Sequence, residues 1–328
     1  MLGAYCRDCP RRCGAFRVLR RERGGDPAPV GGFCGAPFSP VLARAGLHFW
    51  EEPVLSGSRG SGAVFFSGCN LRCRFCQNYD ISARAAGEQI SVHRLRQIYA
   101  ELIAQGAHNI NLVTPTHYVR AVAASLRHPL PVPVIYNSNG YELPESLALL
   151  RGKIAIYLPD LKYADDTLAR DLSGAQNYFR TATAAIQAMY DQVGPYQLGA
   201  DGLLKRGVII RHLALPGQLE NSFRVIDFVA EKFRPKQVLF SLMFQYLPQG
   251  PILSDARYGE LHRKLVFREL KALRDHLFSS GIEDGFIQSY QSAKAEYIPK
   301  FDGTGVLTSA AGQEKCLLRL LRSGTEIL

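Results

Sequence analysis

The stretch SGCNLRCRFCQN, residues 67–78, carries three of the chain's eight cysteines within eight positions. Cys69, Cys73 and Cys76 have the spacing C-x3-C-x2-C and follow an apolar run, AVFFS (63–67), that is typical of a buried strand. Structural zinc sites are almost always four-coordinate, whereas a cubane 4Fe–4S cluster held by three thiolates keeps one iron open. Three thiols on one polar loop therefore predict a cluster whose open iron can bind a substrate or a cofactor.

Strands and helices alternate after residue 60. The expected strands cover residues 63–67, 109–114, 134–138, 154–162, 207–217 and 238–243, with a weaker one at 285–290. The expected helices cover residues 91–106, 118–126, 144–150, 165–172, 177–193, 223–233 and 257–278. This alternation predicts an α/β fold with a parallel sheet and helices outside it. Six strong strands favour a partial (β/α)6 TIM-like barrel, which places its chemistry on the loops after the strands.

The loop SGSRGSG (56–62) is the best candidate for a domain boundary, because glycine and serine dominate it. We expect a small cysteine-rich N-terminal metal-binding region over residues 1–58. The barrel, with a C-terminal extension, is expected over residues 59–328.

Four further cysteines, Cys6, Cys9, Cys13 and Cys34, lie near the N-terminus with the spacing C-x2-C-x3-C-x20-C. Four thiols make a closed ligand set, which suits a structural zinc ion. They equally suit a second 4Fe–4S cluster that passes an electron toward the first or binds substrate. The sequence leaves both metals open. The remaining thiol, Cys316, stands alone on an apparent helix and is interpreted as inert.

The composition is that of an ordinary globular protein, with 328 residues of which 47% are hydrophobic and 21% charged. No apolar run has the length of a membrane span or a signal peptide, so we expect a cytoplasmic protein without membrane partners. Clustered thiols in a reducing compartment favour metal over disulfides.

The net charge is +10, and residues 7–23 hold seven arginines against two acidic residues. Such a segment suits an anionic substrate, an acidic partner or nucleic acid. Phe16 alone interleaves with the arginines, and one aromatic residue does not make a stacking surface for bases, so a solvated basic face is favoured and nucleic acid is not expected.

The run FFSGCNLRCRFCQN, with the aromatic Phe75 before its last cysteine, resembles the hallmark of the radical S-adenosylmethionine (radical SAM) superfamily. The Asn-Gly turn in YNSNGYE, the Asp-x-Lys of YLPDLKY and the arginine before Pro-Gly in VIIRHLALPG resemble, in order and spacing, the activating enzymes of glycyl radical proteins. With SLMFQY and YIPKFDGTG included, the chain is similar to the pyruvate formate-lyase activating enzyme-related iron–sulfur subfamily.

The resemblance implies a 4Fe–4S cluster on Cys69, Cys73 and Cys76, with S-adenosyl-L-methionine bound to the open iron through its amino and carboxylate groups. It implies an oxidoreductase that takes an electron from a donor such as flavodoxin or ferredoxin and cleaves the sulfonium bond. The 5′-deoxyadenosyl radical released then abstracts hydrogen from a substrate. That substrate is open between a protein glycine, a peptide side chain and a small metabolite.

The resemblance also implies roles for side chains near the strand ends. Phe75 would lie against the adenine, and Ser138 and Asn139 would face the methionine or the ribose. Asp160 and Lys162 would form a shared site at the end of their strand. Arg211 would contact the methionine carboxylate or the substrate. Asp160 and Lys162 have an alternative interpretation as a strand-end salt bridge. His212 is interpreted as part of a capped strand end.

Two places depart from the activating enzymes. Those enzymes end their second strand in Gly-Gly-Glu, which holds the amino group, whereas this chain has VTPTHY, where Thr114 and Thr116 supply oxygens but no carboxylate. After the sixth strand they place a histidine, and here the stretch is FQY, with Gln245 and Tyr246. Both departures weaken the prediction that the substrate is a glycyl radical protein.

A second hypothesis belongs to a different class. The arginine-rich segment beside four cysteines would suit a metal-stabilised binding module whose basic arm meets an acidic partner or RNA. Such binding would weaken steeply with added salt. This hypothesis explains neither the strand–helix alternation nor Phe75, so the radical SAM enzyme ranks first.

Overall fold

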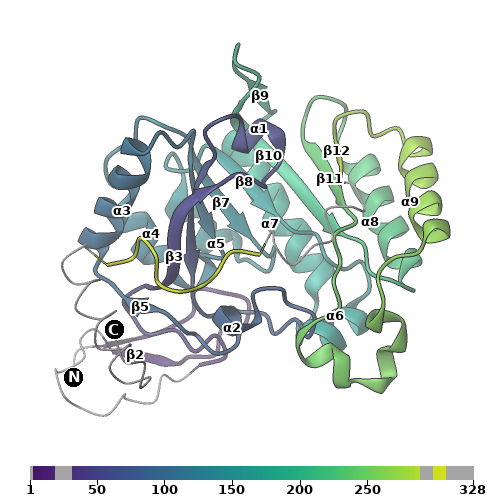
Figure 1. Cartoon of the computed structure of the whole chain (residues 1–328), viewed down its shortest axis with the longest axis horizontal. Coiled ribbons are helices and arrows are strands. Elements are labelled where there is room, and N and C mark those ends of the chain that lie inside the picture. The colour runs from purple at the N-terminus through teal and green to yellow at the C-terminus, as the bar shows by residue number, and fades with distance from the viewer. Residues whose placement is uncertain (1–2, 19–31, 289–297, 308–328) are drawn as a thin grey trace, which may run out of the picture.

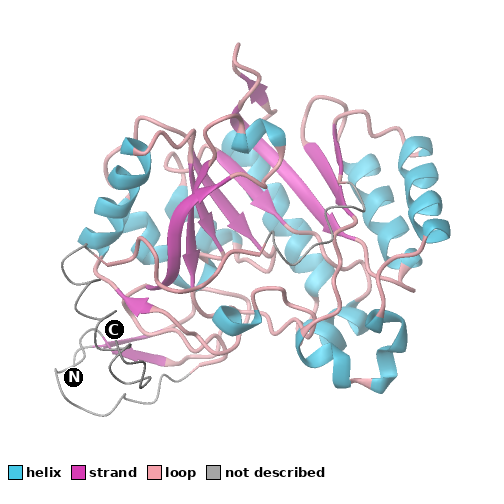
Figure 2. Ribbon diagram, in the orientation of Figure 1, coloured by secondary structure: helices cyan, strands magenta, loops and turns pink. Residues whose placement is uncertain are grey.

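The computed structural model describes residues 3–18, 32–288 and 298–307. One large mixed sheet forms the centre of the molecule, and helices pack along its outer side (Figures 1 and 2). A hairpin of β1 (Gly3–Tyr5) and β2 (Phe16–Val18) forms a separate small sheet. Cys316 lies outside the described residues, so its interpretation stays a prediction.

The parallel strands of the main sheet follow the predicted order along the chain. Their bounds are β4 (Ser61–Phe66), β6 (Ile110–Val113), β7 (Val134–Ser138), β8 (Ile156–Pro159), β10 (Leu204–Leu213), β11 (Leu239–Met243) and β12 (Gly285–Ile287). Their order in the sheet is β12-β11-β10-β8-β7-β6-β4, with every neighbouring pair parallel. The six strong strands and the weak last strand expected from the sequence are therefore confirmed.

Antiparallel strands extend this set. β3 (Val41–His48) pairs with β4, β5 (Glu88–Gln89) pairs with β3, and the short β9 (Gln197–Leu198) pairs with β10. In the described part of the chain the sheet runs from β12 to β5 without closing into a ring, so the barrel is partial, as predicted. β3 lies inside the expected N-terminal region 1–58, so the main sheet begins before the boundary that the sequence suggested.

Helices connect the parallel strands and cover their outer face (Figure 2). They are α3 (Val92–Ala104), α4 (Val119–Ser125), α5 (Pro144–Leu147), α6 (Asp166–Ser173), α7 (Tyr178–Val193), α8 (Leu219–Lys232) and α9 (Phe267–Ser279), with the short α1 (Pro53–Ser56) and α2 (Tyr79–Ser82) around β4. Ser91 caps the start of α3, where its side-chain oxygen accepts the Arg94 N–H. None of the described helices has the length and apolar character needed to cross a membrane.

The prediction of a single long helix over residues 257–278 is wrong. A 3-10 helix, η4 (Ala256–His262), ends at extended residues, and α9 begins after them. Glu269 Oε2 accepts the Val266 N–H at 2.9 Å and an Arg263 guanidinium N–H at 2.8 Å. This carboxylate caps the first turn of α9 through local side-chain contacts that apolar periodicity does not reveal.

Side chains of the parallel strands alternate between two faces of the sheet. Positions such as Val64, Tyr136 and Ile210 pack outward against helices. The intervening positions point into the barrel, where Leu55 of α1 packs with a cluster of strand residues: Ile135, Ile156, Leu158, Leu204, Ile209 and Leu239. α1 lies at the end of the sheet where the parallel strands begin (Figure 1), so this cluster closes the barrel floor and leaves the opposite end for a site.

Leu55→Ala should lower the free energy of unfolding by about 2–5 kcal/mol, because it removes a fully buried side chain from the barrel floor. Leu149→Ala is the matched control, since that leucine is 38% exposed and its loss should cost about 0.5 kcal/mol or less. Urea unfolding of both variants measures the two changes. Equal losses of unfolding free energy in the two variants would contradict the conclusion that the packing of the barrel floor depends on Leu55.

Candidate functional site

The loop after β4 carries the three clustered cysteines at the end of the sheet where the parallel strands finish (Figure 1). Its main chain binds the carboxyl end of α6: the Arg72 N–H donates to Ser173 O at 3.1 Å, and the Arg74 N–H donates to Leu172 O at 2.9 Å. The last carbonyls of a helix have no partner within the helix, so they can accept from another segment. Contacts within the protein therefore fix the course of the cysteine loop.

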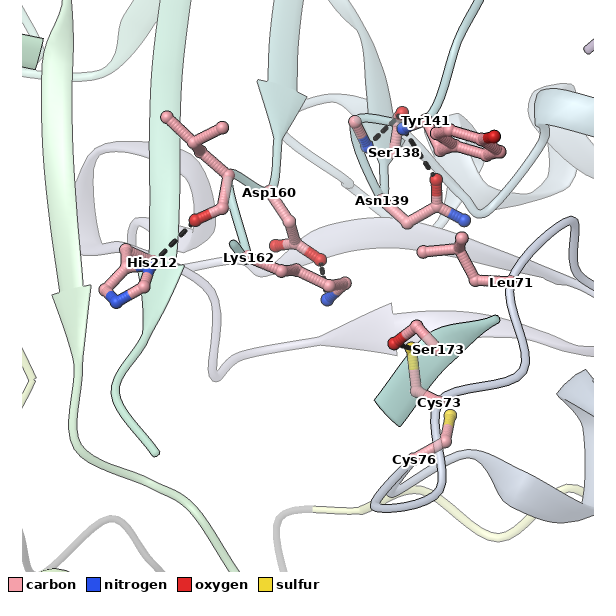
Figure 3. Close-up of polar contacts among 12 residues, drawn as sticks. Leu71, Cys73, Cys76, Ser138, Asn139, Tyr141, Asp160, Lys162, Ser173 and His212 are labelled. Atoms are coloured by element: carbon pink, nitrogen blue, oxygen red, sulfur yellow. Dashed lines mark hydrogen bonds and ion pairs between the residues drawn. The ribbon is translucent and has the colours of Figure 1, made fainter. Parts of the chain in front are cut away.

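Each of the three thiols accepts a hydrogen bond from the protein. The donors are the Leu71 N–H and Asn139 Nδ2 for Cys69, both 3.3 Å from sulfur; Ser173 Oγ for Cys73, at 3.0 Å (Figure 3); and Ser82 Oγ for Cys76, at 3.3 Å. Such donors stabilise a thiolate, the form that binds iron. Burial opposes them: it raises the pKa of Cys69, and it raises that of Cys73 to about 11 although Lys162 lowers it. Coordination to iron would stabilise the thiolates against this effect of burial.

Asp160 and Lys162 lie where β8 ends, across from the cysteine loop (Figure 3). Lys162 Nζ donates to Asp160 Oδ2 at 2.5 Å, so the strand-end salt bridge considered from the sequence is present. Burial would lower the pKa of Lys162, but the Asp160 carboxylate and the Cys73 thiol raise it above its ordinary value. The ammonium therefore stays charged near Cys73, where it favours the thiolate. A cofactor-binding role for the pair stays a prediction.

A carboxylate that the sequence analysis did not predict lies between the ends of β6 and β7. Glu142 is fully buried, and its Oε1 accepts from Thr116 Oγ1 at 2.5 Å and from Ser138 Oγ at 2.7 Å. Its Oε2 has no hydrogen-bond partner among the described residues. Burial raises the pKa of Glu142 to about 7, although the hydroxyls of Thr116, Ser138 and Tyr136 lower it. The loop after β7 thus brings a carboxylate to the place where VTPTHY lacks one.

Asn139 is buried and connects the end of β7 to the first thiol of the triad. Its Nδ2 donates to Cys69 Sγ and, at 2.7 Å, to Asn70 Oδ1. Its Oδ1 accepts the Tyr141 N–H at 3.0 Å (Figure 3). Thr114, which follows β6, has a left-handed backbone with φ of 57°, an unusual conformation for a β-branched residue. The hydrogen bonds of Asn139 and the restricted backbone of Thr114 therefore fix the conformation of the strand ends around the cysteine loop.

Arg211 of β10 points into the barrel toward two carboxylates from the loop between β3 and α1. Its Nε donates to Glu52 Oε1 at 2.9 Å, and its Nη2 contacts both Glu51 and Glu52. Asn111 Nδ2 donates to Glu51 Oε1 at 2.8 Å. Burial would lower the pKa of Arg211, but the two glutamates raise it, so the guanidinium stays charged. Its contact with the methionine carboxylate stays a prediction, because protein carboxylates hold the guanidinium in this structure.

Phe75 is buried and packs against Tyr246, with ring centroids 5.8 Å apart. Tyr246 follows β11, in the stretch where the activating enzymes place a histidine, and Gln245 lies half-buried before it. His212 is fully buried and its Nδ1 contacts Leu161 O at 2.7 Å (Figure 3), which fits its interpretation as part of a strand end. An aromatic pair thus stands beside the last cysteine of the triad.

The loop of the β1–β2 hairpin carries Cys6, Cys9 and Cys13, and Cys34 joins them from further along the chain. The Cys6 N–H donates to Ala15 O at 2.9 Å and closes the loop. Cys6, Cys9 and Cys34 are buried, whereas Cys13 is exposed. Burial raises the pKa of Cys9 to about 12, and negative charge on Cys34 and Cys6 adds to the rise, so these three thiols are neighbours.

Two further contacts concern Cys13 and Cys34. Cys13 Sγ lies 3.5 Å from the position that a Cβ on Gly32 would take, two residues before Cys34. Arg17 Nη2 donates to Cys34 Sγ at 3.4 Å. Cys34 therefore lies beside a guanidinium, whose charge favours its thiolate, and Cys13 lies close to the segment that leads to Cys34.

The donor sets of both sites have the chemistry of iron–sulfur ligands. Three thiols with hydrogen-bond donors on one loop suit a 4Fe–4S cluster with an open iron, and the four cysteines of the N-terminal region have the number that a closed site needs. Within residues 3–18, 32–288 and 298–307, no three thiol, imidazole or carboxylate groups approach closely enough to chelate one ion. A cubane is wider than one ion and needs no such convergence.

Residues 63–226, half of the chain, match the family model of the radical SAM superfamily. The chain belongs to the radical SAM superfamily. Enzymes of this superfamily bind a 4Fe–4S cluster and cleave S-adenosylmethionine, and the matched span contains the whole cysteine loop. The prediction of a radical SAM enzyme with these two cofactors is therefore confirmed at the level of the superfamily.

A relative of this radical SAM chain in Methanocaldococcus jannaschii, the uncharacterized protein MJ0674, is 29% identical in an alignment of 276 residues that covers 81% of this chain and 72% of the relative. Among solved structures, SuiB of Streptococcus suis bound to S-adenosylmethionine has a TM-score of 0.46 and 16% identity over 70% of this chain, which spans about half of SuiB. A domain of a pyruvate-formate lyase-activating enzyme from Bacteroides vulgatus has a TM-score of 0.33 and 13% identity over 60% of this chain and 91% of that domain.

The buried carboxylates of this radical SAM chain were not among the site residues predicted from the sequence. Glu142 ends the stretch YNSNGYE, three residues after Asn139, so its place directly after a strand was a usable signal. Glu51 and Glu52 stand as an acidic pair in HFWEEPVL, between apolar residues, a setting that indicates burial with a cationic partner. Neither signal identifies the residue that each carboxylate contacts, because Thr116 and Arg211 are distant from the glutamates in the sequence.

The raised pKa of Glu142 predicts a dependence of stability on pH. The unfolded carboxyl titrates near 4.5 and the folded one near 7, so the folded protein binds the extra proton between these values. Stability must then fall as the pH rises through about 7. Between about pH 5 and about pH 8, we expect wild type to lose up to about 3 kcal/mol relative to Glu142→Gln, which cannot titrate.

Urea unfolding at the two pH values measures this difference. Glu145→Gln is the matched control, because Glu145 is exposed and should leave the wild-type pH dependence unchanged. Parallel pH profiles of wild type and Glu142→Gln would contradict a buried carboxyl that is protonated below neutral pH.

Proposed function

We propose that this radical SAM enzyme abstracts a hydrogen atom from a substrate bound at the carboxyl end of the barrel, with a protein, a peptide and a small metabolite as the candidate classes. The observation that carries the proposal is the cysteine loop after β4, whose three thiols each accept a hydrogen bond and whose Cys73 faces the Asp160–Lys162 pair (Figure 3). Cys69, Cys73 and Cys76 would hold a 4Fe–4S cluster, which would supply the electron for reductive cleavage of S-adenosylmethionine and so, with hydrogen taken from the substrate, the chemistry that yields methionine and 5′-deoxyadenosine.

Glu142 would take the place of the glutamate that the activating enzymes carry after their second strand. Its unpartnered Oε2 is a buried acceptor, and the cationic amino group of the cofactor is a donor that would satisfy it. Thr116 and Ser138 hold the other oxygen. Binding a cation would lower the pKa of Glu142 from about 7 and favour the carboxylate.

Other side chains would contribute binding and charge. Phe75 and Tyr246 offer an aromatic pair against which the adenine can lie. Lys162 keeps a positive charge near Cys73, and Asp160 orients it. Thr114, Asn139, Arg211 and Gln245 would line the edge of the cofactor site.

A low-potential electron donor such as flavodoxin or ferredoxin would reach the cluster from the side of Cys76. This thiol is partly exposed and lies in the wall of a surface cavity of about 450 Å³. The other lining residues come from two segments, and they are Gln77, Tyr79, Asp80, Arg84, Gln249, Gly250 and Pro251. The cavity supports an approach to the triad that does not cross the barrel interior.

The N-terminal thiols would hold a second 4Fe–4S cluster. Cys6, Cys9 and Cys34 are buried neighbours, and Arg17 donates to Cys34, which suits a closed set of thiolates. The alternative of a basic arm for an acidic partner or RNA loses support, because the side chains of Arg11, Arg12 and Arg17 contact this protein itself.

Cys73→Ala should abolish the formation of 5′-deoxyadenosine and remove about four irons per chain, because two thiols cannot hold the open cluster. The measurements are iron, acid-labile sulfide and zinc after anaerobic reconstitution, and 5′-deoxyadenosine released from S-adenosylmethionine under a strong reductant. About eight irons in wild type would support two clusters, and about four irons with one zinc would support a structural zinc at the N-terminal thiols.

Cys13→Ala is the matched control, because it removes one N-terminal thiol and leaves the triad intact. It should lose the N-terminal metal and keep the irons of the triad. Full 5′-deoxyadenosine formation by Cys73→Ala, or a wild type that takes up zinc but no iron, would overturn the proposed function.

A further inference from the structure

The tip of the β1–β2 hairpin directs two neighbouring arginines at the barrel. The Arg12 N–H donates to Cys9 O at 2.9 Å, and Arg12 has a left-handed φ of 42°, so the chain turns tightly between Cys9 and Cys13. From this turn Arg12 reaches the exposed Glu145 at 2.5 Å. Arg11 points elsewhere, toward the cysteine loop after β4. The two side chains leave the same turn and have different surroundings.

Arg11 donates to three main-chain carbonyls. Its Nε donates to Asn70 O at 2.9 Å, its Nη2 to Ser173 O at 3.4 Å, and its Nη1 to Gly174 O. Asn70 follows Cys69 in the cysteine loop, whereas Ser173 and Gly174 end α6. A cation at the carboxyl end of a helix is electrostatically favourable. One guanidinium thus joins the two segments on which the triad depends.

The residues that Arg11 holds are next to the groups that donate to thiols. Asn70 Oδ1 accepts from Asn139 Nδ2, the atom that also donates to Cys69 Sγ. Ser173 Oγ donates to Cys73 Sγ at 3.0 Å. A shift of the Asn70 or the Ser173 main chain would therefore change the geometry of a hydrogen bond that the Cys69 or the Cys73 sulfur accepts.

On its other side, Arg11 depends on the N-terminal cysteine site. Its guanidinium lies 3.7 Å from the centre of the Phe33 ring, a cation–π contact, and Phe33 directly precedes Cys34. Arg72 Nη2 donates to Phe33 O at 2.9 Å and fixes the same residue. Arg11 itself stands between Cys9 and Cys13 in the chain. The positions of these thiols therefore determine where the guanidinium lies.

We infer that Arg11 is a positioning residue that couples the N-terminal cysteine site to the hydrogen bonds on the Cys69 and Cys73 sulfurs, and so tunes the reduction potential of the triad cluster. The inference rests on the proposed function. Hydrogen bonds to the sulfurs and nearby positive charge stabilise the reduced, more negative cluster. Loss of Arg11 removes a charge and loosens these donors, so the cluster becomes harder to reduce.

The test compares Arg11→Ala with Arg12→Ala in the reconstituted holoenzyme. A potentiometric titration followed by electron paramagnetic resonance measures the cluster whose signal changes when S-adenosylmethionine is added, which identifies the triad site. In Arg11→Ala the ratio of reduced to oxidised cluster at a fixed potential should fall about tenfold, a shift of about 59 mV to more negative potential. Arg12→Ala, from the same turn, should leave the ratio unchanged.

Arg11→Lys separates the effect of charge from that of the hydrogen bonds, because lysine keeps the positive charge but lacks the guanidinium group that donates to three carbonyls. Its ratio should lie between wild type and Arg11→Ala. Equal ratios in wild type, Arg11→Ala and Arg12→Ala, on a cluster that responds to S-adenosylmethionine, would overturn the inference and leave the proposed function standing. A wild type without any such cluster would overturn both.

The coupling itself is tested by a double-mutant cycle with Cys13→Ala, which disrupts the N-terminal metal site at its exposed thiol. Alone, this variant should shift the triad potential in the same direction as Arg11→Ala. If the metal acts through Arg11, the double variant should shift little further than Arg11→Ala alone. Fully additive shifts would show two independent effects and overturn the coupling.

Discussion

The docking of the cysteine loop on the carboxyl end of α6 is the contact on which the site depends. Helix-terminal carbonyls are unpaired within the helix, and here those of Leu172 and Ser173 accept from the main chain of the cysteine loop. Gly174 ends α6 in a left-handed conformation, which turns the chain away and leaves these carbonyls accessible. The same turn places Ser173 Oγ on the sulfur of Cys73.

The barrel interior is divided into an apolar floor and a charged layer above it. The floor is built around Leu55, and directly before it in the chain Glu51 and Glu52 reach Arg211. Burying three charges is costly even when they are paired, and an apolar filling would serve stability as well or better. The charges are therefore better explained by the site. They keep a polar, hydrogen-bonded wall beneath the end of the barrel where the cysteine loop lies.

The repeated part of the fold was predictable, because each parallel strand is an apolar run and each helix has its own periodicity. The triad was equally visible, since its three ligands are local in the sequence. β3 was not predicted: VLARAGLH mixes an arginine with small residues, and its pairing with β4 depends on the partner strand. Glu142 shows the same limit at the site, because its meaning comes from Thr116, which lies on a different strand end.

The placement of the arginines shows why net charge alone was a poor guide to partners. The segment that raised the possibility of polyanion binding directs Arg11 and Arg17 inward, toward carbonyls and a thiol. Lys162 brings a further positive charge to Cys73. Thiolates and iron–sulfur clusters are anionic, and burying them without compensation is costly. Part of the positive charge of this chain therefore balances its own cysteine sites, and the side chains that provide this balance are not free to bind an external polyanion.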